Sequence, residues 1–383
     1  YNILHETFNY GIGAQYMINK GNYITADCYA DHFSSSYCFF KDNKTYNGKA
    51  GEEQVRKRTR NHNLSIKGIF KLGNRHKLSV GTEYIVDVLK SQTDNIAKED
   101  AYTLALFAQD EIKLLRNLQA LIGVRYIYHE NFKNHATPNV ALMYKPGKFN
   151  FRASYAAGFR TPTLSELYAT DIAKKNDRLT IGNLDLKPEK NNYFSLSAEY
   201  VHERFSVSVN AFYNNIRDMI DYNTIATGDK AMEQYGHKEV RQRDNIAEAK
   251  VHGINVSANA YLGAGFNLSG GYTHLNTQDV ELEQPIDKSI KNAYNINAQW
   301  AHSWKIYRLN INLNGRINSK RFSKSYGYAP EYQLWDLNTR HSFNLKSVII
   351  EPGFGMENLF DYMDDRPYNS NYATLTPGRS FYI

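Results

Sequence analysis

Residues that could carry covalent or metal chemistry are few and scattered in this sequence. The twelve histidines do not cluster, and the two cysteines, Cys28 and Cys38, form no CxxC pair, so no zinc-type ligand set is present. The motifs GxSxG, HExxH and GxxxxGKS/T are absent. For His129 and His274, expected near strand ends, a polar-wall role is favoured over catalysis. The sequence therefore predicts a protein that is not an enzyme and holds no metal of its own.

Two further features concern crosslinking and charge. A disulfide between Cys28 and Cys38 requires the chain to fold back, because ten extended residues would hold them roughly 33 Å apart. The net charge is +7, and the run RKRTRNH from Arg56 to His62 places four cations in five positions. No basic helix or nucleic-acid motif accompanies it. We interpret this run as a solvated loop or a contact with an anionic surface, and we expect no nucleic-acid partner.

The elements that must position any binding residues are β-strands. Aromatic residues make up 14% of the chain, with 30 Tyr and 19 Phe, and no run approaches the roughly 20 apolar residues of a transmembrane helix. From Tyr307 to Asn318 apolar residues alternate with Arg and Asn, and the same period recurs at 118–128, 149–160, 194–200, 205–213 and 266–272. Strands of this length suit a tilted membrane crossing, although a soluble sandwich also alternates.

Connections between the roughly seventeen predicted strands alternate in length, which favours the membrane interpretation. Tight turns are expected at 19–22, 73–76, 115–117, 146–148, 202–204, 263–265, 303–305 and 345–347, and longer loops near 34–55, 90–101, 129–136, 161–191, 221–245, 275–291, 319–331 and 361–376. This order places all turns at one end, unlike a Greek-key sandwich. The predicted fold is all-β: an antiparallel transmembrane β-barrel whose polar face lines a lumen and whose tyrosines serve the two interfaces.

Four stretches resemble the TonB-dependent outer-membrane receptor family. They are AGFRTPTLSELY (157–168) followed by GNLDLKPE (182–189), NIAEAKVHGIN (245–255), ALFAQDEI (105–112) and the C-terminal segment 355–383. The family-motif positions on them are Phe159, Arg160, Pro162, Asn183, Leu186, Pro188, Glu189, Asn358, Leu359, Phe360, Pro377, Gly378 and Arg379. The resemblance implies a 22-stranded barrel plugged by an N-terminal domain. It also implies a receptor whose loops and lumen bind a scarce ligand, imported when TonB pulls on the plug.

The chain departs from the family pattern in its extent. With about 17 strands, residues 1–383 are expected to be part of a single barrel domain, with the plug and first strands outside this chain. Seventeen strands cannot close with antiparallel pairing throughout, because both terminal strands would run the same way. The implied partners are the TonB complex through the missing plug, outer-membrane lipid and, in some bacteria, a surface lipoprotein. The implied location is the outer membrane of a Gram-negative bacterium, with long loops extracellular and short turns and C-terminus periplasmic.

The ligand stays open between tetrapyrroles and ferric siderophores. Haem receptors of the family carry a histidine between their two boxes, and here no histidine lies between Thr163 and Gly182. Haem would then rely on Tyr168 as an oxygen ligand, and cobalamin on polar and aromatic contacts. The loop candidates are Tyr168, Tyr222, Tyr235, His237, Tyr326 and Tyr328. An anionic siderophore would instead favour lumenal Arg152, Arg160 and Arg316, whose structural alternative is pairing with acidic groups.

Among these functions, uptake of cobalamin or haem is the main hypothesis and uptake of a ferric siderophore is the alternative. A passive porin and an outer-membrane barrel enzyme are less favoured, and no covalently bound cofactor is implied. The stretch from Gly158 to Glu189 shows no clear period. We expect it to leave a strand at Arg160, form an extracellular excursion and re-enter the wall near Asn192. Ligand identity is expected to reside in its middle, residues 169–181.

Overall fold

The computed structural model describes residues 1–44, 46–173, 177–324, 326–364, 373–374 and 376–383. Most of the chain is β-strand. The strands are β1 (Asn2–Asn19), β2 (Asn22–Cys38), β3 (Glu53–Leu72), β4 (His76–Ser91), β5 (Ile96–Leu115), β6 (Leu118–His129), β7 (Lys133–Tyr144), β8 (Phe149–Arg160), β9 (Thr170–Ala173), β10 (Arg178–Ile181), β11 (Glu189–Val201), β12 (Phe205–Thr227), β13 (Glu239–Gly263), β14 (Phe266–Asp279), β15 (Asn292–Trp304), β16 (Tyr307–Asn318), β17 (Arg321–Ser323), β18 (Gly327–Ala329), β19 (Tyr332–Leu345), β20 (Val348–Ile350), β21 (Gly353–Glu357) and β22 (Ser380–Tyr382). Two helices, α1 (Leu164–Tyr168) and α2 (Gly228–Tyr235), complete the described elements. Neither has the length and apolar character that a membrane-crossing helix needs.

The predicted strands and tight turns agree with this structure. The short strands β9, β10, β17 and β18 lie in connections, and β20 with β21 makes one interrupted strand, so seventeen main strands remain among the residues that the structure describes. β8 and β16 have the predicted bounds, Phe149–Arg160 and Tyr307–Asn318. All eight predicted tight turns fall between consecutive strands. The all-β antiparallel prediction is confirmed.

Two of the predicted long loops are wrong. β4 and β5 are separated only by residues 92–95, and β6 and β7 only by 130–132, where loops at 90–101 and 129–136 were expected. β3, β4 and β5 are 20, 16 and 20 residues long, whereas about 9–11 tilted residues suffice to cross a bilayer. Their polar ends therefore continue as strand and resemble loop in composition. The predicted loop at 361–376 lies largely outside the described residues.

The remaining long connections contain secondary structure of their own. The connection after β8 holds α1, β9 and β10, and it re-enters the sheet with β11 at Glu189, close to the expected position. The connection between β12 and β13 holds α2, and that between β16 and β19 holds β17 and β18. The predicted excursion between Arg160 and Asn192 is thus a small folded subdomain rather than an irregular loop.

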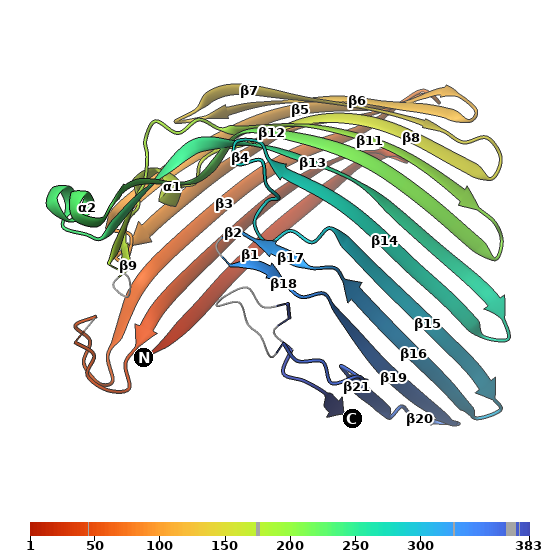
Figure 1. Cartoon of the computed structure of the whole chain (residues 1–383). Coiled ribbons are helices and arrows are strands. Elements are labelled where there is room, and N and C mark those ends of the chain that lie inside the picture. The colour runs from red at the N-terminus through yellow and green to blue at the C-terminus, as the bar shows by residue number, and fades with distance from the viewer. Residues whose placement is uncertain (45, 174–176, 325, 365–372, 375) are drawn as a thin grey trace. The chain divides into compact units, whose positions relative to one another are not determined.

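The structure divides into two compact units. The first unit comprises Tyr1–Ala141, Ala156–Asn192 and Ile216–Ala247, and the second comprises Leu142–Tyr155, Tyr193–Asn215 and Glu248–Ile383. In the first, β1 to β6 pair consecutively and antiparallel, and Figure 1 shows them as long neighbouring strands. β10 departs from this pattern, pairing antiparallel with β9 and parallel with β13. The single-domain organisation and the plug outside this chain stay predictions.

The second unit continues the antiparallel order. β13, β14, β15, β16 and β19 pair one after another, as Figure 1 shows, and β19 then pairs with β20 and β21. β21 pairs in turn with the last strand, β22. The tight turns that the sequence predicted join β13 to β14, β15 to β16 and β19 to β20.

In the first unit the sheet has one apolar and one polar face. Residues directly opposite in antiparallel pairs lie on the same face, and the register aligns Cys28, Leu64, Tyr84, Leu104 and Tyr128 in one row. Within this row Leu64 is 48% and Leu104 40% exposed, as expected of a lipid-facing wall. On the other face the Asn61 amide donates to Asp87 at 2.8 Å, and Arg125 pairs with Glu83.

Two smaller predictions are also resolved. Cys28 and Cys38 both lie on β2, without a turn between them, and both are free thiols, so the chain does not fold back to pair them. The run from Arg56 to His62 lies within β3 and is not a loop. Its charges are therefore presented in a fixed order by a strand, which matters for both sites described below.

Candidate ligand-binding site

The family motif around β8 forms a charged brace at the base of the connection that follows. Arg160 donates to Glu189 from Nε and Nη2 at 2.7 and 2.6 Å, and to Glu166 from Nη1 and Nη2 at 2.8 and 3.3 Å. The side chains of Glu166 and Glu189 are only 13% and 15% exposed. Glu189 also accepts the Ile220 N–H at 2.8 Å. One arginine thus ties β8, α1 and β11 together.

Helix α1 is fixed by its cap and by burial. Thr163 and Glu166 form a capping box, in which each side chain accepts the other's backbone N–H. Burial of Glu166 opposes its ionisation, but the hydrogen bonds from Arg160 and Thr163 outweigh this and lower the pKa of its carboxyl. Leu167 packs with Leu186 and Ile220. The motif prolines Pro162 and Pro188 are buried on either side, so these motif residues build the support of the connection.

Asn245 on β13 completes the support of this connection. Its Oδ1 accepts the Lys187 N–H at 2.7 Å, while its Nδ2 donates to the carbonyls of Lys187 and Asp218 at 2.9 and 2.6 Å. One amide side chain therefore satisfies three backbone groups of two other segments. The motif residue Asn183 makes a local turn, accepting the Asp185 N–H at 2.9 Å. Phe159 stacks with His135, with ring centroids 4.6 Å apart.

The C-terminal family motif forms a second brace, within the second unit. Asn358, only 2% exposed, exchanges two hydrogen bonds with the backbone of Tyr362. Asp361 accepts the Arg379 N–H at 2.7 Å, and Gly378 adopts a φ of 102° that favours glycine. The Leu359 N–H bonds the Trp335 carbonyl at 2.6 Å. Phe360 is 63% exposed, and Pro377 and Arg379 are also exposed.

A β-bulge in β3 places an arginine against a tyrosine cluster. Ser35 pairs with Lys57 and Ser36 with Val55, so Arg56 is an extra residue opposite them. Its guanidinium lies 4.3 Å from the ring centroid of Tyr37. The Tyr37 ring is in turn 4.6 Å from that of Tyr46 and 4.8 Å from that of Tyr1. The Arg56 Nε is buried and lacks a hydrogen-bond partner within the described part of the chain.

A second arginine from the β9–β10 hairpin acts on the same carboxylate as Arg56. Burial and the charge of Asp94 raise the pKa of Asp171, while Arg178 and Arg56 oppose that rise. The Nε of Arg178, like that of Arg56, is buried without a hydrogen-bond partner among the described residues. Two partly unsatisfied guanidinium groups and one carboxyl group with a raised pKa therefore share one region.

Lys57 connects these residues to a cavity of ≈ 430 Å³ beneath α1. Its Nζ lies 3.1 Å from the Ser165 hydroxyl and 3.7 Å from the Asp94 carboxylate. Polar residues line the cavity on the sheet side, among them Asp31, whose Oδ1 is buried and unsatisfied within the described residues. We call the residues Arg56, Lys57, Arg178, Tyr37 and Asp171 the basic site. It can hold an anionic ligand by charge-assisted hydrogen bonds and ring contacts.

The predicted site residues of the first unit contact different partners. Tyr168 ends α1, where burial and the nearby Glu99 and Glu130 raise the pKa of its hydroxyl. The Tyr222 ring stacks with Arg243, 3.5 Å from its guanidinium, and His237 Nδ1 bonds Asp177 at 2.8 Å. Tyr235 ends α2. Arg160 is held by two carboxylates, which matches the structural alternative for that arginine.

Four predicted residues lie in the second unit. Arg152 is 3.5 Å from Glu199, again an acidic partner on a polar face. Arg316 is exposed on β16. Tyr326 and Tyr328 are 39% and 52% exposed in the β17–β18 hairpin, where the Tyr328 ring lies 5.3 Å from that of Phe322. Their part in ligand binding stays a prediction.

No group of three or more His, Cys, Asp or Glu side chains is arranged to hold a metal ion in the described ranges. Sequence reasoning missed the residues of the basic site. The signal was present in RKRTRNH, where the adjacent cations Arg56 and Lys57 interrupt the alternation that Arg58 and Arg60 continue. A broken alternation inside a strand is what a bulge produces.

Long antiparallel strands with one apolar and one polar face, joined by tight turns at one end, define the wall of an outer-membrane β-barrel. The chain belongs to the TonB-dependent receptor-like β-barrel family, whose model matches residues 2–359. This is a family of transport receptors rather than enzymes.

Solved structures share the fold at low sequence identity. The ferric enterobactin receptor PfeA of Pseudomonas aeruginosa matches with a TM-score of 0.80 and 18% identity, over 99% of this chain and 60% of that one. The siderophore receptor PirA of Acinetobacter baumannii gives 0.74 and 16%, over 98% and 61%. The FrpB iron transporter of Neisseria meningitidis gives 0.73 and 14%, over 98% and 62%. The chain thus spans about three fifths of the length of these proteins.

Proposed function

We propose that this chain forms most of the barrel wall of an outer-membrane receptor for TonB-dependent uptake of a ferric siderophore. The observation that carries the proposal is the pair Arg56 and Arg178, two guanidinium groups with buried unpartnered Nε atoms beside Asp171. Buried donors of this kind are costly unless an acceptor arrives. An anionic chelate supplies such acceptors, and Tyr37 offers an aromatic face.

The structural neighbours favour the siderophore alternative over cobalamin or haem. One of them is named a ferric enterobactin receptor, another a siderophore receptor and a third an iron transporter. The segment 163–182 contains no histidine, and the nearby His237 is bonded to Asp177. This region therefore does not favour a tetrapyrrole that needs an axial histidine ligand.

In this proposal the long connections face the cell exterior, and the tight turns and C-terminus face the periplasm. TonB would act through a plug domain outside this chain, and a surface lipoprotein is an optional partner. The aromatic rows of the apolar face would contact outer-membrane lipid. No step of the proposed function involves covalent chemistry, since TonB-linked force and ligand binding suffice.

Binding to the purified full-length receptor tests the proposal. The probes are an anionic ferric tris-catecholate, an uncharged ferric tris-hydroxamate, haemin and cyanocobalamin. We expect the tris-catecholate to bind most tightly, and the Arg56→Gln and Arg178→Gln variants to weaken it about tenfold or more, since each removes a charge-assisted contact. Arg75→Gln, in the tight turn before β4, is the matched control. Preferential binding of haemin or cyanocobalamin, unaffected by either variant, would overturn the siderophore assignment.

A further inference from the structure

A second basic cluster lies on the opposite, exposed face of the first unit. It consists of Arg58, Arg60 and Lys90. The register places Arg58 directly opposite Lys90 on β4 and Ser34 on β2, and places Arg60 opposite His32 on β2. Arg58 and Arg60 are both exposed, as is Lys90. These cations are distinct from the basic site, because Lys57 alternates to the other face of the strand and the bulge turns Arg56 to that face as well.

Exposure along β3 identifies this face as the apolar one. Arg58, Arg60 and His62 are exposed, and the same alternation continues through Leu64 and Ile66. The intervening residues from Thr59 to Ser65 are partly buried. Along one face the strand therefore passes from cations through a histidine to aliphatic side chains. That order is expected where a membrane wall leaves the hydrocarbon and enters the headgroup layer.

An aromatic row marks the boundary between these two zones. Tyr84 on β4 lies opposite Leu64 on β3, and its ring centroid is 6.0 Å from that of Tyr102 on β5. The Tyr102 and Tyr128 rings are also 6.0 Å apart. The Lys133 ammonium lies 6.0 Å from the Tyr128 ring. Tyrosines in such a row are typical of a membrane interface, and the basic cluster lies directly beyond them along the strands.

The three cations are not paired with the acidic groups of this face, although Glu6 on β1 lies opposite Ser34, which in turn lies opposite Arg58. Like charges directly opposite each other in a strand pair are destabilising, and Arg58 faces Lys90. None of Arg58, Arg60 and Lys90 forms a salt bridge among the residues that the structure describes. The nearest strand on that side, β5, offers Asp100, which is 3.0 Å from Lys98. An anion from outside the chain would relieve the repulsion.

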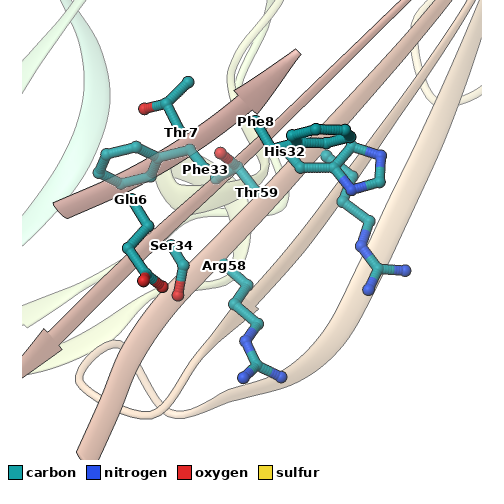
Figure 2. Close-up of a pocket in the computed structure, with 9 residues that line it drawn as sticks. Glu6, Thr7, Phe8, His32, Phe33, Ser34, Arg58 and Thr59 are labelled. Carbon is teal, nitrogen blue, oxygen red and sulfur yellow. The ribbon is translucent and has the colours of Figure 1, made fainter. Parts of the chain in front are cut away.

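A hollow of ≈ 450 Å³ adjoins the cluster. Figure 2 shows Arg58, Ser34 and Glu6 on one side of the strands and Thr7 on the other. The His32 Nε2 is buried and has no hydrogen-bond partner within the described ranges. Phe8 adds an apolar edge. The lining carries two guanidinium groups against the single carboxylate of Glu6. With hydroxyl and imidazole groups and an apolar edge, this net positive lining suits a phosphate carried on a lipid.

We propose that Arg58, Arg60 and Lys90 bind the phosphorylated sugar headgroup of a lipid in the outer leaflet of the outer membrane. The arginines and the lysine contact the phosphates, while Tyr84 and Tyr102 lie at the level where sugar meets acyl chain. The assignment to the outer leaflet rests on the proposed function, which puts the long connections outside the cell. The binding chemistry itself rests only on the face, the charges and the hollow.

The test measures lipid binding to the detergent-purified full-length receptor by native mass spectrometry and fluorescence titration. The probes are bisphosphorylated lipid A, the same lipid without phosphates, phosphatidylglycerol and inorganic phosphate. We expect lipid A to bind most tightly and the triple variant Arg58→Gln, Arg60→Gln, Lys90→Gln to weaken it by about tenfold or more. The control Lys71→Gln, Arg75→Gln makes the same kind of change at the other end of β3 and should bind like wild type.

Several other results of these binding measurements would contradict the proposed lipid site. Equal binding of the phosphate-free lipid, of phosphatidylglycerol or of inorganic phosphate alone would overturn the proposal, as would wild-type affinity in the triple variant. If the triple variant does not fold, the single variant Arg60→Gln must show a smaller but measurable loss. Ferric-chelate binding should be unchanged in these variants. Loss of chelate binding by wild type with lipid A binding retained would reject the proposed function and leave this inference standing.

Discussion

The guanidinium of Arg160 donates two hydrogen bonds to the carboxylate of Glu189, from Nε at 2.7 Å and from Nη2 at 2.6 Å. This parallel pair needs a planar fork of donors, which lysine does not possess. The same arginine bonds Glu166 as well, so a single side chain holds two segments of the connection that leaves β8.

Replacing Arg160 should therefore weaken the folded connection. Arg160→Gln leaves the largely buried Glu166 and Glu189 without their cation, and we expect a loss of about 1–3 kcal/mol in unfolding free energy. Arg160→Lys should restore only part of it. Thermal unfolding of the purified barrel, followed by its electrophoretic shift, measures the change. The control Arg152→Gln loses one exposed contact at 3.5 Å and should change stability little; an equal loss in both variants would contradict the brace.

Asn245 gives a second, local prediction. Asn245→Asp turns the Nδ2 donor into an oxygen that faces the carbonyls of Lys187 and Asp218, so the contacts become repulsive. We expect faster backbone hydrogen exchange across residues 186–189, measured by mass spectrometry. Asn183→Asp is the matched control, because that side chain only accepts a hydrogen bond from the Asp185 N–H and a carboxylate still can. Unchanged exchange in Asn245→Asp would show that this amide does not hold the connection.

The raised pKa of Asp171 makes binding at the basic site depend on pH. Burial and Asp94 raise this pKa, so Asp171 is neutralised at a higher pH than an ordinary aspartate as the solution is acidified. Arg56 and Arg178 then lose a competing anion, and affinity for an anionic chelate rises. At neutral pH, Asp171→Asn should bind the tris-catecholate ~3–10-fold more tightly than wild type.

That advantage of Asp171→Asn should disappear on acidification. Below the raised pKa the wild-type carboxyl is also neutral, so the ratio of the two dissociation constants should approach one. Protonation of the chelate itself cancels in this ratio. Isothermal titration at several pH values provides the measurement, and a ratio that stays constant with pH would rule out Asp171 as the titrating group.

Cys28 reports directly on the apolar face. It is an exposed free thiol in the same row as Leu64, whereas Cys38 lies at the far end of β2, opposite Asn2 and Glu53. In intact outer membranes a membrane-soluble maleimide should label Cys28, and a membrane-impermeant one should not. Both reagents should label Cys28 after transfer to detergent. Labelling of Cys28 in intact membranes by the impermeant reagent would mean that this row does not face lipid.

The fold was predictable from sequence because apolar and polar residues alternate along strands whose two faces contact different environments. This alternation located β8 and β16 to the residue. The same alternation predicted long loops around 92–95 and 130–132, where the connections are short. The strands there project beyond the hydrocarbon and both of their faces become polar, so their ends resemble loops in sequence. The motif residues Arg160 and Glu189 were found, but their role in bracing a connection depends on partners 6 to 31 residues away.

The candidate site was harder to predict for a different reason. Tyr37, Arg56 and Arg178 come from three separate segments, and only the register of β2 with β3 shows that Arg56 turns towards Tyr37. Arg58 and Arg60 belong to the same charged run but point to the other face. A run of charge in the sequence thus divides into two sites, with opposite exposure, once a strand fixes its geometry.

The bulge at Arg56 divides β3 into two parts that pair with β2 in registers differing by one residue. Residues from Lys57 onward keep the register of the wall, whereas the segment before Arg56 follows a register shifted by one. Deletion of Arg56 would leave Val55 opposite Ser36 and Lys57 opposite Ser35, so both parts of the strand would keep their faces and their pairing with β2. The bulge therefore adds one arginine to the basic site without altering the strand pairing that builds the wall.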